Sequence, residues 1–83
     1  MTDECASCKL LSGVASGVQS VVRRVEGRRS FMSRLAALGL VVGAHLEVLQ
    51  NSGRGPLLVR VHNTRVALGR NEATKVLVEE LAG

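Results

Sequence analysis

Two cysteines near the N-terminus, Cys5 and Cys8, have the spacing of metal ligands. Two thiolates separated by two residues can hold one tetrahedral ion such as zinc or iron. In a reducing cytosol this spacing is more typical of metal binding or redox chemistry than of a structural disulfide. A closed zinc site needs two further ligands, and the βαβ setting of a thioredoxin-like motif is missing. The pair is therefore a candidate metal site, and an incidental pair of cysteines is the alternative.

Two histidines, His45 and His62, lie in strand-like segments. They could complete a metal site only if the fold brought them to the cysteines; otherwise they are surface residues. The sequence offers no nucleophile with a base and an orienting acid, and no two carboxylates that fall in one predicted cleft. The glycine patterns of nucleotide-binding loops are also missing. The sequence therefore predicts a protein that is not an enzyme.

The charge and the aromatic content of the chain limit its partners. Lysine and arginine outnumber the acidic residues by 11 to 7, which permits a nucleic acid or an anionic membrane as partner. Phe31 is the single aromatic residue of the sequence. Modules that bind single-stranded nucleic acid stack bases on aromatic side chains, and SH3 domains that bind proline-rich peptides need an aromatic-lined groove. We therefore expect recognition through loops, arginines and aliphatic patches, and keep a basic nucleic-acid-binding barrel as an alternative.

The segment around Phe31 is predicted to form one short helix. Phe31, Leu35 and Leu38 recur at i, i+4 and i+7, which places them on one helical face. We therefore expect a helix near residues 30–38, with Ser30 as its N-cap and these three side chains directed into the core.

Short strands are predicted before and after this helix, and a glycine joins the helix to the strands that follow it. Gly39 is predicted to end the helix in a left-handed conformation, with Leu40 folding back onto Leu35. Strands are predicted at residues 17–25, 45–50, 57–62, 65–68 and 75–79, with Asn63 in a tight turn and a single helical turn capped by Asn71. One helix among closely spaced strands implies a small, mainly β barrel of five or six strands.

The chain is short enough for one domain. We expect residues 1–9 to be a mobile leader that carries both cysteines, and residues 10–83 to form the barrel. No apolar run approaches the roughly 20 residues of a membrane span, and the acidic N-terminus is unlike a signal peptide. We therefore expect a cytoplasmic protein.

Several segments resemble FeoA-type proteins, the small accessory proteins of bacterial ferrous iron uptake. Residues 34–43, Arg-Leu-Ala-Ala-Leu-Gly-Leu-Val-Val-Gly, are similar to the family segment R-L-x-x-L-G-L-x-P-G, with Val42 in place of the proline. Residues 11–17 resemble the family's opening and residues 55–57 its central loop, while residues 65–79 resemble its close. The resemblance covers about residues 10–80, in the family's order.

The resemblance implies an SH3-like β-barrel that serves as a non-enzymatic accessory or regulatory protein of ferrous iron uptake. Its implied partner is the cytoplasmic part of FeoB, a membrane transporter with an attached G-protein domain, so the protein could also lie peripherally at the inner face of the membrane. No small-molecule substrate is implied, and a weak homo-oligomer stays open. The rival functions are the nucleic-acid-binding barrel and a small metal carrier using Cys5 and Cys8.

A contact surface for this partner is predicted at the helix stop and the loop around Pro56. Its expected residues are Arg34, Leu40, Gly43, Arg54, Pro56 and Leu57. For Leu40 and Leu57, packing at an end of the barrel is the alternative interpretation.

Overall fold

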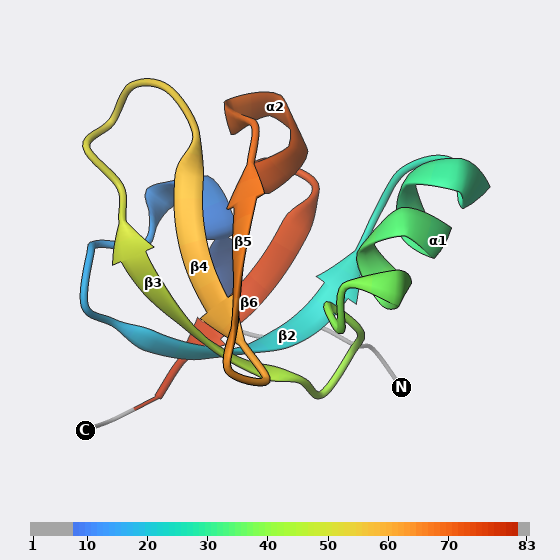
Figure 1. Ribbon diagram of the computed structural model, residues 1–83, viewed down its shortest axis with the longest axis horizontal. Coiled ribbons are helices and arrows are strands. Elements are labelled where there is room, and N and C mark those ends of the chain that lie inside the picture. Colours follow the sequence, from blue (N-terminus) through green and yellow to red (C-terminus); the bar gives the residue numbers. More distant parts are fainter. Residues whose placement is uncertain (1–7, 82–83) are drawn as a thin grey trace.

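A computed structural model describes residues 8–81, which form a curled, six-stranded antiparallel sheet (Figure 1). The strands are β1 (Cys8–Leu10), β2 (Gln19–Val25), β3 (His45–Gln50), β4 (Leu57–Val61), β5 (Thr64–Leu68) and β6 (Val76–Glu80), in the spatial order β1-β6-β2-β3-β4-β5. The helical elements are the 3-10 turn η1 (Leu11–Gly13), α1 (Arg29–Ala37) and the short α2 (Arg70–Ala73). The predicted mainly β architecture with an inserted helix is confirmed.

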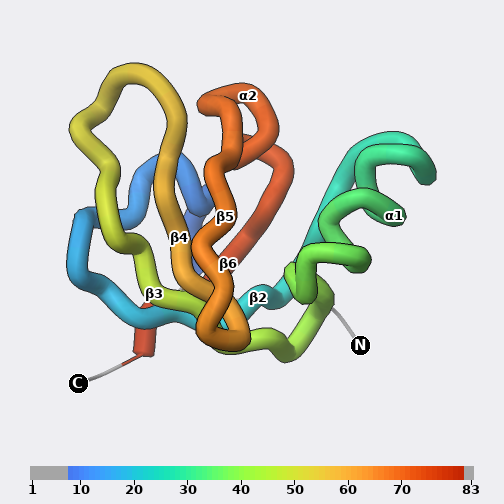
Figure 2. The backbone as a smooth tube through the Cα atoms, in the orientation of Figure 1, coloured from blue at the N-terminus to red at the C-terminus, as the bar shows by residue number. Residues whose placement is uncertain are grey.

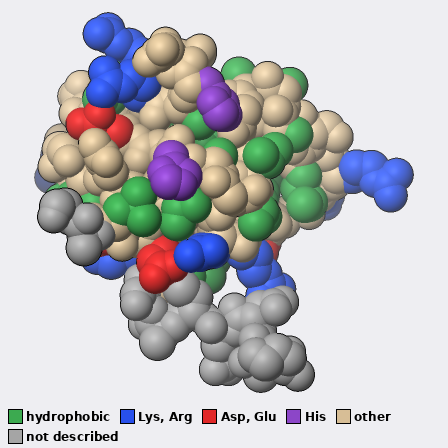
Figure 3. Space-filling model, turned by 90° about the horizontal axis from the view of Figure 1, so that it is seen from below, with side chains coloured by type: hydrophobic (Ala, Val, Ile, Leu, Met, Phe, Trp, Pro, Cys, Tyr) green, Lys and Arg blue, Asp and Glu red, His purple; other side chains and the backbone are tan. Residues whose placement is uncertain are grey.

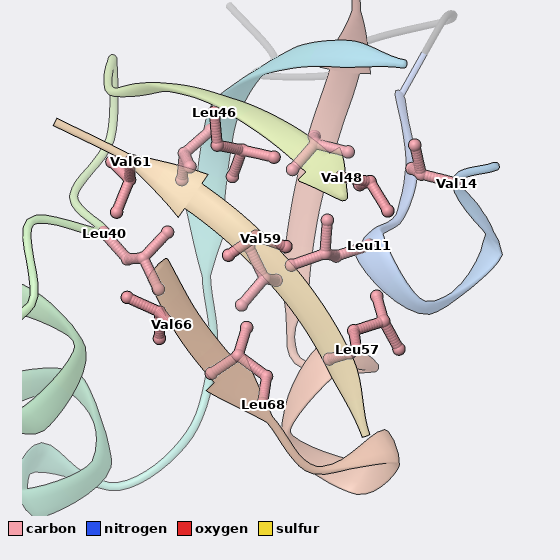
Figure 4. Packing of buried hydrophobic residues seen from close by; sticks show 14 of the residues in the cluster. Leu11, Val14, Leu40, Leu46, Val48, Leu57, Val59, Val61, Val66 and Leu68 are labelled. Atoms are coloured by element: carbon pink, nitrogen blue, oxygen red, sulfur yellow. The ribbon is translucent and has the colours of Figure 1, made fainter. Parts of the chain in front are cut away.

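The core is built from aliphatic side chains on the concave face of the sheet (Figure 4). In β4, Leu57, Val59 and Val61 point inward at every second position, which is the alternation expected of a strand with one buried face. The cluster consists of Leu11, Val14, Val22, Leu35, Leu40, Ala44, Leu46, Val48, Leu57, Val59, Val61, Val66, Leu68, Ala73, Val76 and Val78. Phe31 is only partly buried at the edge of this cluster, so the core itself contains no aromatic ring.

The hairpin between β4 and β5 closes through a two-residue turn at His62 and Asn63. Both residues have positive φ angles, 52° and 62°. Two successive left-handed residues give the turn the twist that matches the flanking strands, which explains why Val61 pairs directly with Thr64. The prediction of a left-handed Asn63 is confirmed. Figure 2 shows the hairpin as the tight orange turn at the lower end of the molecule.

Helix α1 differs from its prediction at both ends. It begins at Arg29 with Arg28 as N-cap, and no side chain caps it, so the prediction of Ser30 as N-cap is wrong. Leu35 is fully buried, but Leu38 is 39% exposed, so its assignment to the core is also wrong. The reason is visible in Figure 1, where α1 projects from the side of the barrel. The core therefore contacts only part of the helical face that the sequence pattern marks as apolar.

The helix stop has the predicted geometry. Gly39 has a φ of 93°, its N–H donates to the carbonyl of Ala36, and the N–H of Leu40 donates to the carbonyl of Leu35 at 2.9 Å. These are the two hydrogen bonds of a Schellman motif. Leu40 then enters the core beside Leu35. The stop thus turns the chain back toward the barrel and fixes the residues that follow.

Two further boundaries differ from expectation. Helix α2 is capped by Gly69, whose N–H donates to the Glu72 carboxylate at 2.9 Å, so Asn71 is not the cap. A carboxylate at the third helical position can satisfy the free N–H at the start of the helix, and it replaces the asparagine in this role.

Strand β1 begins at Cys8. Cys8 and Lys9, which were predicted to belong to the leader, therefore pair with β6.

Candidate partner-binding surface

The predicted contact surface is divided between two ends of the barrel. Residues 38–44, which follow α1, lie at the lower end in Figure 1, whereas the β3–β4 loop with Arg54 and Pro56 lies at the upper end near α2. The prediction that these two segments form one surface is therefore wrong. Sequence order could not show this, because β3 separates the segments and carries the chain from one end of the barrel to the other.

Two of the predicted contact residues are core residues. Leu40 and Leu57 are 1% and 0% exposed, which supports their alternative interpretation as packing residues. Gly43, Arg54 and Pro56 are exposed and stay candidates for contact with a partner.

Arg34 has a structural role in the folded chain. Its guanidinium forms an ion pair with the carboxylate of Glu72 and lies 5.7 Å from the centroid of the Phe31 ring. Because Glu72 belongs to α2, this ion pair connects the projecting helix α1 to the barrel. Lys75 lies over the same ring at 5.5 Å from its centroid. The aromatic ring therefore helps to position α1, as cation–π contacts of this kind are stabilising.

A polar network around Asn51 holds the Pro56 loop in place, and the sequence analysis missed it. The Asn51 side-chain amide donates to the carbonyls of Ser12 and Val14 at 3.0 and 2.7 Å. Its carbonyl oxygen accepts from the Arg70 guanidinium, which also donates to the carbonyl of Gly55. One asparagine thus joins three segments that are distant in the sequence. The only feature of the sequence that indicates this network is a single asparagine at the end of a predicted strand.

We expect Asn51→Ala to destabilise the protein by about 1–3 kcal/mol, because the Val14 carbonyl loses its side-chain donor and the Arg70 guanidinium loses an acceptor. Chemical denaturation measures the free energy of unfolding. Asn71→Ala is the matched control, since the Asn71 side chain is exposed and makes no hydrogen bond within residues 8–81. It should change stability by less than about 0.5 kcal/mol. Equal effects of the two substitutions would show that the network does not stabilise the fold.

The structure exposes a group of aliphatic side chains near the end of α1. Met32, Leu38, Val41 and Val42 are 42%, 39%, 44% and 64% exposed, and we call them the aliphatic surface. Seen from below in Figure 3, hydrophobic side chains gather on the α1 side of the molecule, next to the two histidines. Grouped apolar exposure of this kind is typical of interaction sites rather than of ordinary protein surface.

A groove of about 590 Å³ opens between α1 and the end of β2, and it includes part of the aliphatic surface. Its lining residues are Val25, Gly27, Arg29, Met32, Ser33, Ala36, Leu40, Val41 and Val42. Leu40 connects the groove to the core, because its side chain is almost completely buried.

The charges within residues 8–81 leave a surplus of free arginines. Each glutamate of this part of the chain forms an ion pair with a lysine or arginine: Glu26, Glu47, Glu72, Glu79 and Glu80. Four exposed arginines have a guanidinium group with neither an ion pair nor a hydrogen bond to another described residue: Arg28, Arg29, Arg54 and Arg65. Two of them, Arg28 and Arg29, lie at the start of α1 and beside the groove. This end of the molecule therefore favours an acidic partner.

The metal site predicted at Cys5 and Cys8 extends beyond the described residues and stays a prediction. Residues 8–81 contain no group of three or more histidine, cysteine, aspartate or glutamate side chains that could hold an ion. Cys5, the first residue of the predicted pair, lies outside the described residues. His62 instead packs beside Gly39, where a Cβ atom would lie 2.6 Å from its ring.

Comparison with known proteins identifies the family of this chain. Residues 9–80 match the FeoA domain. The chain belongs to the FeoA family. A solved FeoA structure from Chlorobium tepidum is 34% identical, covers 90% of this chain and 72% of that one, and superimposes with a TM-score of 0.83. The prediction of an SH3-like FeoA-type barrel is thereby confirmed.

Two further similar proteins are longer than this chain. A Porphyromonas gingivalis protein that fuses Fe(2+) transport protein A to the Fe(2+) transporter FeoB is 39% identical over 70 residues, which are 83% of this chain. The chain spans only 8% of that fusion protein. A manganese-dependent transcriptional repressor shares the fold alone, with 21% identity and a TM-score of 0.84 over 94% of this chain and 44% of that one. Within residues 8–81, no helix is long and apolar enough to cross a membrane.

Proposed function

We propose that this FeoA-family protein is an accessory protein of ferrous iron transport that acts by binding a FeoB-like transporter. The observation that carries the proposal is the fusion relative, in which an Fe(2+) transport protein A and FeoB form a single polypeptide. Two proteins that are fused in one organism are often separate, interacting chains in another. A small β-barrel with an exposed aliphatic surface fits an accessory role of this kind.

The aliphatic surface at the end of α1 is the proposed contact. Its apolar side chains supply area that a partner can remove from water, and the free arginines beside it supply charge that can steer an acidic partner. The exposed residues Arg54 and Pro56 at the other end of the barrel are proposed as a second contact, because the Asn51 network holds their loop in a defined position.

We expect this protein to bind the FeoB-like transporter of its own organism when the transporter is purified into lipid nanodiscs. The measurement is biolayer interferometry with the immobilised 83-residue chain. Deletion of its gene should also lower uptake of radiolabelled Fe²⁺, and a plasmid copy should restore it.

Absence of binding to the transporter, together with normal uptake in the deletion strain, would contradict the proposed function. Binding to unrelated DNA and RNA that weakens steeply with salt would favour the nucleic-acid rival instead, since phosphate contacts release counterions.

A further inference from the structure

One wall of the groove beside α1 is a continuous face of that helix. Arg29, Met32, Ser33 and Ala36 fall at i, i+3, i+4 and i+7, so they lie on one face of the helix. Ser33 and Ala36, between the centre of α1 and its C-terminal end, are small residues, so the backbone of a partner segment can approach the helix closely there. The opposite wall is formed by the end of β2 and by residues 40–42.

The groove is apolar along its length and charged at one end. Met32, Val41 and Val42 supply its exposed apolar area. Arg29 is the only charged residue among its lining residues, and neither it nor Arg28 has an ion pair within residues 8–81. The glutamate nearest in sequence, Glu26, is paired with Arg24 at 3.1 Å.

The shape of the groove favours a protein segment over a lipid surface. A concave, apolar channel along a helix accepts the side-chain ridge of another helix or of an extended strand. Helices that lie on a membrane instead insert a convex apolar face, whereas the apolar side chains here come from both α1 and residues 40–42 and line a groove between them. The two arginines add a requirement for negative charge at the end of the groove where α1 begins.

Building on the proposed function, we infer that this groove receives a cytoplasmic segment of the FeoB-like transporter in which aliphatic side chains have an aspartate or glutamate at one end. The aliphatic side chains pack between α1 and residues 40–42, and the carboxylate pairs with Arg29 or Arg28. Such a segment would be recognised by its pattern of apolar and acidic residues rather than by a proline-rich or aromatic motif.

Two pairs of variants test the inference against the nanodisc-embedded transporter. Met32→Glu introduces a charge into the groove, and its control is Leu10→Glu, which changes another aliphatic residue of 42% exposure outside the groove. Arg29→Glu reverses the charge at the end of the groove, and its control is Arg65→Glu, which changes another exposed, unpaired arginine. We expect each groove variant to weaken binding about tenfold or more, whereas each control stays within about twofold of the unmodified protein.

A crosslinking measurement makes the test independent of folding effects. A photoreactive benzoylphenylalanine replaces Val42, and in a control protein it replaces Leu10. We expect the first protein to crosslink to the transporter, and mass spectrometry should place the crosslink in a cytoplasmic segment that carries aliphatic and acidic residues. Replacing the acidic residue of that segment with lysine should restore binding to the Arg29→Glu variant.

The results distinguish failure of the inference from failure of the proposed function. If the unmodified protein binds the transporter and the groove variants bind equally well, the groove is not the docking site, although the proposed function stands. If the unmodified protein does not bind, both fail. Binding to protein-free phosphatidylglycerol vesicles that the groove variants abolish would assign the groove to a membrane surface and overturn the inference.

Discussion

Leu35→Ala is expected to destabilise the protein by about 2–5 kcal/mol, the range observed for large-to-small changes in a core. Leu35 is fully buried, and it is the only residue of α1 that is. Its side chain therefore anchors a helix that otherwise projects from the barrel (Figure 1). Loss of the side chain removes buried apolar contact and leaves a cavity where α1 meets the core. Unfolding in urea, followed by circular dichroism, measures the change.

Leu38→Ala, just after the same helix, is the control for this experiment. It repeats the substitution of the first variant at a leucine that is exposed at the end of α1. We expect it to change stability by less than about 1 kcal/mol. If both substitutions had the same effect, α1 would not be anchored through Leu35. Because Leu38 belongs to the aliphatic surface, its variant should lose transporter binding more than stability.

Gly39→Val is expected to destabilise the protein by about 2–4 kcal/mol. A β-branched residue adopts a φ of 93° only with strain, and backbone strain of this kind costs on the order of 1–3 kcal/mol. A Cβ atom at this position would also lie 2.6 Å from the His62 ring. Because the Schellman motif directs Leu40 into the core, distortion here also disturbs the residues that line the groove.

Substitutions at two other glycines separate the effect of backbone strain from that of crowding by the His62 ring. Gly43 has a φ of 94°, but a Cβ atom added there would have no neighbour within 4 Å, so Gly43→Val tests backbone strain alone. Gly13 has neither a positive φ nor a close neighbour, and Gly13→Val should be nearly neutral. Thermal unfolding should rank the variants with Gly39→Val least stable and Gly13→Val most stable. If adding His62→Ala restores part of the stability that Gly39→Val removes, crowding by the His62 ring contributes to the loss. If the three glycine variants unfold at the same temperature, neither backbone strain nor crowding explains the effect.

A rigid helix stop matters for function because it presents the groove. Gly39 fixes the direction in which the chain leaves α1, Leu35 fixes the helix on the barrel, and the ion pair between Arg34 and Glu72 joins the helix to α2. A binding site that is already formed loses less conformational entropy when its partner binds. The same residues that stabilise the fold therefore hold the proposed docking site in its shape before a partner binds.

The sequence by itself determined the features that depend on neighbouring residues. Strand β3 has the predicted bounds, His45–Gln50, because alternating apolar residues specify a strand with one buried face. The left-handed conformations of Gly39 and Asn63 also followed from residue type, since few residues adopt positive φ readily. The family resemblance rested on the same local segments, and the match over residues 9–80 confirmed it.

The tertiary structure alone decided which of these segments meet. Leu38 has the same spacing as Leu35, yet it is exposed because the barrel contacts only part of α1. The helix stop and the Pro56 loop both looked like parts of one surface, but strand β3 places them at opposite ends of the barrel. Asn51 meets Arg70 because the antiparallel order β3-β4-β5 puts the ends of β3 and β5 at the same end of the barrel. The local sequence pattern specifies which segments form helices, strands and turns. The exposure of a side chain and the shape of the groove depend instead on contacts between residues distant in sequence, which no local pattern encodes.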